Sequence, residues 1–137
     1  MNIGIDIRSL VSPVRTGVGE YAHGFLNAIF ELDKPPLERG KQNQYFLFYN
    51  SYRDISKNIP QWTQNNVHYI AARWPNKILN ASIKILGKPK LDNTIIKNLK
   101  LKIKNLDWFF SPNPNFISLS QKTKLILTIH DLSFEFY

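Results

Sequence analysis

The sequence contains no cysteine and no long apolar run, and each absence excludes a class of protein. Without cysteine, neither disulfide bonds nor thiolate metal sites can form, as is common in a reducing compartment. No apolar stretch approaches the ~20 residues that a membrane-spanning helix needs. Asp6 and Arg8 interrupt the first apolar stretch, so no signal peptide is predicted at the N-terminus. We therefore expect a cytoplasmic protein, at most peripheral to the inner face of the membrane.

Motifs for common cofactors are also missing. No Gly-Lys-Ser/Thr sequence is present, which excludes a Walker A loop. No Asp-x-Asp pair is available to hold a divalent cation against a nucleotide diphosphate. The three histidines, His23, His68 and His130, are dispersed and have no carboxylates at metal-ligand spacing. We expect neither a metal ion nor another bound cofactor.

Acidic residues are few, and the excess of positive charge is local. The chain carries 18 lysines and arginines against 10 acidic residues, which gives a formal net charge of +8. Residues 77–104 contain eight lysines and a single acid, Asp92. This segment is interpreted as a solvated helix face, as a surface that contacts anionic membrane lipids, or as a nucleic-acid site. We favour the first two together and expect no nucleic acid among the partners, because no nucleic-acid-binding motif accompanies the charge.

Hydrophobic periodicity predicts strands that alternate with helices. Alternating or continuous apolar residues indicate strands at 3–7, 45–49, 67–71, 107–111 and 125–129. Apolar residues at helical spacing indicate a helix from Val18 to Leu32, with Thr16 as its N-cap and Pro35 beyond its end. Further helices are predicted at 52–57, 76–86 and 92–106.

This order of elements predicts an α/β fold with one Rossmann-like, doubly wound and mostly parallel sheet. Right-handed crossovers favour the strand order 3-2-1-4-5, numbered along the chain. The first and fourth strands then lie side by side at the switch point, where such sheets bind their ligands. We expect the loops at 8–19, 111–115 and 130–131 to converge there. By length, the 137 residues form one domain.

Two short motifs at that edge suggest chemistry. Gly17 and Gly19 stand at the start of the predicted helix, where unpaired N–H groups and the helix dipole hold anions. A tight turn with close helix packing explains these glycines equally well. They do not form a dinucleotide fingerprint, because a long loop separates them from the first strand. His130 and Asp131 follow the fifth strand, where a histidine beside a carboxylate either moves protons near pH 7 or caps a turn.

Four motifs, taken in order, resemble the N-terminal domain of a GT-B glycosyltransferase of the group 1, subfamily-4-like kind. They extend over nearly the whole chain and are GIDIR at 4–8, RTGVGEY at 15–21, DWFFSPN at 107–113 and IHDLSF at 129–134. The resemblance implies a retaining, metal-independent transfer of a sugar from a nucleotide sugar to a glycan or lipid acceptor, as in polysaccharide biosynthesis.

The resemblance also implies roles for individual residues. Gly17 and Gly19 would lie near the donor diphosphate. His130 would lie near the reacting sugar, with Asp131 orienting it. The further candidates for binding the substrate are Arg8, Arg15 and Thr16.

The sequence departs from this family in one respect. The family's second domain carries two glutamates with seven residues between them. No two glutamates here have seven residues between them; they are Glu20, Glu31, Glu38 and Glu135. We therefore expect residues 1–137 to be a truncated N-terminal domain, incomplete at its C-terminus, without the donor-binding domain and inactive alone. The alternative is a non-catalytic α/β binding module that contacts an anionic membrane or partner through its lysine-rich helix.

Overall fold

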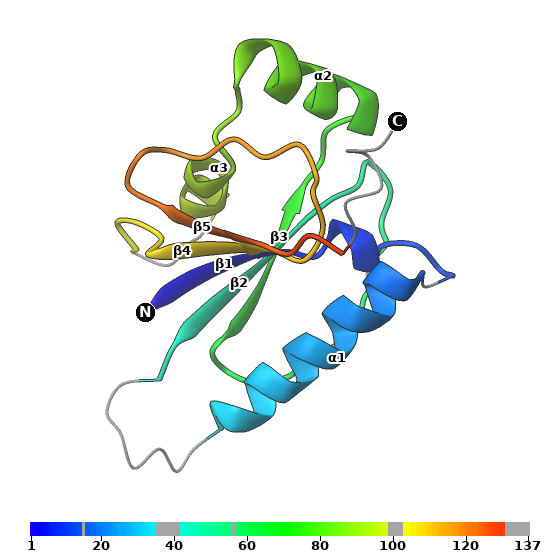
Figure 1. Cartoon of the computed structure of the whole chain (residues 1–137), viewed down its shortest axis with the longest axis vertical. Helices are drawn as coiled ribbons and strands as arrows, with labels where there is room; N and C mark the ends of the chain where they lie inside the picture. Colours follow the sequence, from blue (N-terminus) through cyan, green and yellow to red (C-terminus); the bar gives the residue numbers. More distant parts are fainter. Residues whose placement is uncertain (15, 35–41, 56, 99–102, 131–137) are drawn as a thin grey trace.

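The computed structural model describes residues 1–14, 16–34, 42–55, 57–98 and 103–130, and their centre is a five-stranded sheet (Figure 1). Its strands lie in the order β3-β2-β1-β4-β5, and every neighbouring pair is parallel. The strands are β1 (Asn2–Asp6), β2 (Gln44–Asn50), β3 (Val67–Ala72), β4 (Trp108–Ser111) and β5 (Lys124–Leu127). The structure thus confirms the predicted α/β class and the predicted strand order.

Helices cover the two faces of this sheet. The long helix α1 (Gly17–Leu32) packs on one face, where Leu26 and Phe30 meet Ile5 and Leu47 in a buried cluster. The helices α2 (Asn76–Leu86) and α3 (Leu91–Asn98) belong to the other face. A second buried cluster forms there from Phe46, Phe48, Ile70, Ala72, Leu79, Ile83, Leu91, Ile95, Leu106 and Phe109. Because both faces are covered around β1 and β2, these strands are almost wholly buried.

The connection from β1 to α1 positions residues of the candidate functional site that is described below. A short 3-10 helix, η1 (Arg8–Leu10), follows β1 and buries Leu10. The helix α1 then begins after Thr16, whose Oγ1 accepts a hydrogen bond of 3.4 Å from the Gly19 N–H, as predicted for an N-cap. This connection places Arg8 at the carboxyl end of the central strand.

Two predicted helices differ from the structure. Residues 52 and 53 form a bend, residues 54 and 55 have no regular structure, and residue 57 belongs to a turn, so none of them is helical. The Ser51 hydroxyl there donates to the Arg53 carbonyl at 2.7 Å, a local bond that competes with helix formation. The helix predicted at 92–106 begins at Leu91, and residues 103–106 are not helical. Leu106 is instead buried beneath the sheet, directly before β4.

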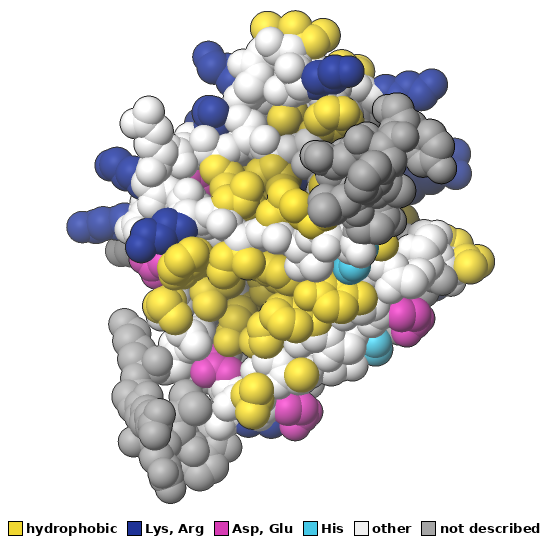
Figure 2. Space-filling view, viewed as in Figure 1, with side chains coloured by type: hydrophobic (Ala, Val, Ile, Leu, Met, Phe, Trp, Pro, Cys, Tyr) yellow, Lys and Arg dark blue, Asp and Glu magenta, His cyan; other side chains and the backbone are white. Residues whose placement is uncertain are grey.

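One part of the sheet has no helix over it among the described residues. An apolar cavity of about 450 Å³ lies on the α1 side of β4 and β5. Its lining residues are Met1, Ile3, Ile5, Phe25, Ile29, Tyr45, Trp108, Phe110 and Ile126. Figure 2 shows the hydrophobic side chains gathered between β5 and α1. The edge strand β5 is exposed along its whole length.

Within the described residues, no helix is both long enough and apolar enough to cross a bilayer.

Candidate functional site

The loops after β1 and β4 meet at the carboxyl edge of the sheet. Asp6 ends β1, and its side chain is fully buried. Its carboxylate accepts hydrogen bonds from Nε of Arg8 at 2.9 Å, from Nη2 of Arg8 at 2.7 Å and from Nδ2 of Asn115 at 3.1 Å. Nη2 of Arg8 also donates to the carbonyl oxygen of Phe116 at 3.1 Å. One buried carboxylate therefore fixes both the arginine after β1 and the loop after β4.

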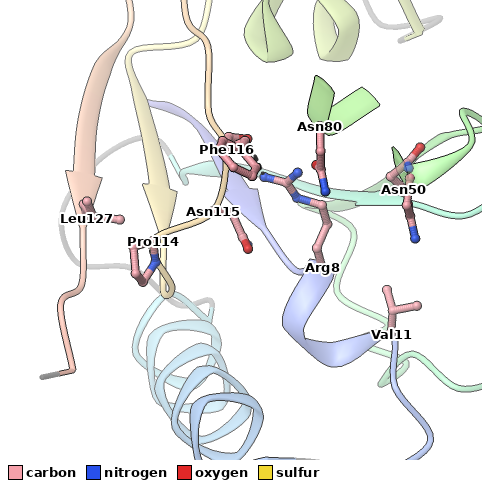
Figure 3. Close-up of a pocket in the computed structure, with 9 residues that line it drawn as sticks. Arg8, Val11, Asn50, Asn80, Pro114, Asn115, Phe116 and Leu127 are labelled. Atoms are coloured by element: carbon pink, nitrogen blue, oxygen red, sulfur yellow. Dashed lines mark hydrogen bonds between the residues drawn. The ribbon is translucent and has the colours of Figure 1, made fainter. Parts of the chain in front are cut away.

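A cavity of about 470 Å³, lined by both polar and apolar side chains, opens at this point. Figure 3 shows the guanidinium of Arg8 between the side chains of Phe116 and Asn80 in this view. The lining residues are Arg8, Val11, Asn50, Asn76, Asn80, Pro114, Asn115, Phe116 and Leu127. They come from η1 and the residue after it, from the ends of β2 and β5, from α2 and from the loop after β4. The cavity thus occupies the switch point between β1 and β4, where open α/β sheets bind ligands.

Some amide side chains of the cavity are held by hydrogen bonds within the protein, whereas another is free to bind a ligand. Asn50 is buried, and its amide bonds the backbone N–H and C=O of Trp74 as well as Oδ1 of Asn76. This contact ties the start of α2 to the end of β2. Asn80 lies one turn after Asn76 on the same helix face. Its side chain makes no hydrogen bond to the described residues, so both its donor and its acceptor are available to a ligand.

The cavity carries little net charge. Arg8 is the one cationic residue that lines it, and Asp6 compensates its charge through a bidentate ion pair. Nη1 of Arg8 makes no hydrogen bond to the described residues, so it remains a donor for a ligand oxygen. Phe116 is 47% exposed and offers a flat apolar surface. One cationic donor, the available Asn80 amide and an aromatic ring suit a ligand rich in hydroxyl or phosphate oxygens.

His130 lies at the same edge but does not line the cavity. Its Nε2 is 2.7 Å from the Pro112 carbonyl oxygen, and because a carbonyl only accepts, Nε2 carries the proton. Its ring also meets the Tyr21 ring edge-on at 4.9 Å between centroids. The loop after β4 and the helix α1 therefore hold His130, and Nδ1 is the nitrogen left for another partner. Asp131 lies outside the described residues.

The start of α1 does not reach the cavity either. Thr16, Gly17 and Gly19 are absent from its lining, and Arg15 lies outside the described residues. Gly17 is exposed, and a Cβ there would meet no atom within 4 Å, so packing does not require a glycine at this position. Gly19 is buried. Of the predicted site residues that the structure describes, only Arg8 lines the cavity.

Sequence reasoning missed the amides. Asn50 ends β2 and Asn115 lies in the loop after β4, so polar residues at or just beyond the ends of buried strands were the available signal. Asn76 and Asn80 are four residues apart, which puts them on one face of a helix. Nothing in the sequence shows toward which strand end that face turns.

Comparison of the chain with protein-family models, with curated proteins and with solved structures gave no match. Among the described residues, no group of three or more histidine, aspartate or glutamate side chains is arranged to hold a metal ion.

Proposed function

We propose that the chain is the acceptor-side part of a retaining glycosyltransferase and that the cavity at Arg8 binds an oxygen-rich part of its substrates. In the reaction, the bond between the anomeric carbon and the diphosphate of a nucleotide sugar breaks. A new bond forms from that carbon to a hydroxyl oxygen of a glycan or lipid acceptor, on the same face of the sugar. The nucleoside diphosphate leaves, and the hydroxyl proton leaves with it.

The observation that supports this proposal is the position and lining of the cavity. It lies at the switch point of the sheet, and its free donors and acceptors match hydroxyl and phosphate oxygens. The four sequence motifs that resemble the glycosyltransferase family provide the separate argument for sugar transfer. Arg8 belongs to the first of these motifs and also lines the cavity.

Each group in the cavity has a task under this proposal. Nη1 of Arg8 donates to a phosphate or hydroxyl oxygen, while Asp6 keeps the guanidinium in place. The Asn80 amide bonds a sugar hydroxyl through both of its atoms, and Phe116 packs against the apolar face of the ring. His130 approaches the reacting sugar with Nδ1, because Nε2 is engaged by Pro112. Gly17 stands at an open helix N-terminus that admits a phosphate.

A binding experiment tests the proposal without requiring turnover. Isotope-labelled chain is titrated with UDP, with UDP-glucose and with maltose while backbone amide resonances are followed. We expect the shifted resonances to cluster at Arg8, Asn80 and Asn115. Replacing Asn80→Ala should weaken binding about fivefold, since one hydrogen bond contributes about 1 kcal/mol.

The matched control is Asn65→Ala. Asn65 is an exposed asparagine just before β3, at the opposite edge of the sheet. It should leave the affinity for all three ligands unchanged. Resonance shifts that avoid the cavity, or equal affinities of the two variants, would contradict the proposal.

A further inference from the structure

The helix α2 carries apolar side chains on two sides. Leu79 and Ile83 are buried against the sheet. Ile78 is 56% exposed and Ile85 is 77% exposed, and with the exposed Ala81 they recur at spacings of three and four residues along the outer side. A helix needs only one apolar side to pack on a sheet. The outer stripe of Ile78, Ala81 and Ile85 is therefore unexplained by the fold.

Lysines border this outer stripe on both sides. Lys77 and Lys84 lie along one side by helical spacing and are exposed. On the other side a cavity of about 360 Å³ adjoins α2. Its lining residues are Trp74, Ser82, Lys88, Pro89, Lys90, Asn93, Thr94 and Lys97. Figure 2 shows hydrophobic side chains at the outer end of the molecule, over α2, among Lys and Arg side chains.

These lysines have no acidic partners. None of the five described lysines between 77 and 97 forms an ion pair with a described residue. The acid in this segment, Asp92, is buried, and the Ser120 and Thr123 hydroxyls donate to it. The positive charge around the stripe is thus uncompensated, and it complements an anionic partner.

We propose that the outer face of α2 docks on an anionic lipid bilayer. Ile78 and Ile85 enter the boundary between headgroups and acyl chains, as in other amphipathic helices that lie in the membrane plane. Trp74, which is 43% exposed, lies at the headgroup level. Lys88 and Lys97 bind lipid phosphates in the adjoining cavity. Trp74 is the one aromatic residue named on this surface, and its other exposed apolar side chains are aliphatic. A nucleic-acid site would instead carry several aromatic rings between the basic residues, on which bases stack.

Vesicle co-sedimentation tests this docking. The chain should bind phosphatidylcholine vesicles that contain phosphatidylglycerol, bind pure phosphatidylcholine vesicles far less, and dissociate as salt is added. Lys84→Gln should weaken binding about fivefold, the factor expected for one lysine at an anionic surface. The control Lys122→Gln removes an exposed lysine elsewhere and should have a smaller effect.

A separate variant tests whether the apolar stripe contributes to membrane binding. Ile78→Ser with Ile85→Ser should abolish most binding, whereas Leu32→Ser, at an 82% exposed residue that ends α1, should not. Brominated lipids should quench tryptophan fluorescence, and Trp74→Phe should remove this quenching. Binding that survives the double isoleucine variant, or that is as strong on a single-stranded oligonucleotide as on the vesicles, would overturn the proposal. The surface is distinct from the cavity at Arg8, so this test stands whether or not the chain takes part in sugar transfer.

Discussion

Among single residues, the buried Asp92 is held by several hydrogen bonds. Asp92 is the second residue of α3, and its carboxylate accepts hydrogen bonds from the Ser120 N–H at 3.1 Å, from the Ser120 hydroxyl and from the Thr123 hydroxyl at 2.8 Å. Burial raises the pKa of Asp92, but these hydrogen bonds outweigh burial and bring the pKa below its ordinary value. Asp92 thereby joins α3 to the segment that leads into β5.

The depressed pKa of Asp92 makes folding stability depend on acid pH. A carboxylate with a lower pKa in the folded state stabilises the fold above its unfolded pKa of ~3.9, and the contribution is lost as the pH falls through the folded pKa. We expect Asp92→Asn to lower the free energy of unfolding by ~1–3 kcal/mol at pH 7 and by less near pH ~3. Urea unfolding at both pH values measures this.

The control for Asp92 is Glu31→Gln. It removes only the exposed ion pair between Glu31 in α1 and Lys34 just beyond the end of that helix, and such pairs contribute less than ~1 kcal/mol. A difference between wild type and Asp92→Asn that stays constant or grows on acidification would disprove the assigned role.

Among the elements, the strand β1 has no room for a side chain at its glycine, whereas the helix α1 has room for one at a glycine in its middle. A Cβ on Gly4 in β1 would lie 2.8 Å from both Leu106 Cδ1 and Phe109 Cδ2, inside the core. Gly24 in the middle of α1 is exposed, and a Cβ there would meet nothing within 4 Å. We expect Gly4→Ala to destabilise the protein by ~1–3 kcal/mol through overpacking. Gly24→Ala should stabilise it by ~0.5–1 kcal/mol, because glycine disfavours a helix interior.

Thermal unfolding of the two variants checks this pair, with each serving as the other's control. Equal changes in melting temperature, or a stabilised Gly4→Ala variant, would mean that the packing around β1 is looser than described.

The elements also show what the sequence could predict. The aromatic run 45–49 and the helical spacing from Val18 to Leu32 are long, regular patterns, and both elements formed as predicted. The strand order followed from general rules of chain connection. The helix predicted at 52–57 is absent from the described residues of that segment, where the Ser51 hydroxyl bonds the Arg53 carbonyl and residues 52 and 53 form a bend.

The residues that line the cavity were only partly predictable from the sequence, because some of them reach it through tertiary packing. Arg8 follows the central strand directly, so its place at the carboxyl edge depends on the sheet alone. Asn80 reaches the same cavity only because α2 packs with Leu79 and Ile83 inward and its start is tied to Asn50. Such a rotation of a helix depends on tertiary packing, which local sequence patterns do not contain.

For the molecule as a whole, the open face beside β5 predicts self-association. Ile126 lines the apolar cavity there and is 47% exposed, and β5 is an edge strand. Exposed apolar surface next to an unpaired strand edge favours pairing between copies. We expect the 137-residue chain to associate as its concentration rises and Ile126→Lys to weaken that association. Sedimentation at several concentrations measures the effect.

The control is Leu32→Lys, which charges an equally apolar but isolated side chain at the end of α1. It should leave the sedimentation profile as in the wild type. A wild-type chain that stays monomeric at high concentration would contradict the prediction.

The parallel sheet order has a consequence for the time course of synthesis. β1 is the central strand, yet one of its two neighbours, β4, is made last but one: Asn2 bonds Asp107, which is 105 residues later in the chain. At translation rates of ~5–20 residues per second, β4 is synthesised on the order of 5–20 s after β1, and one edge of β1 has no partner until then. During that interval β1 to β3 can pair only with one another, so the nascent chain exposes one edge of β1 to solvent or to a chaperone. Slowing or pausing synthesis before residue 108 would lengthen this exposure and lower the yield of folded protein.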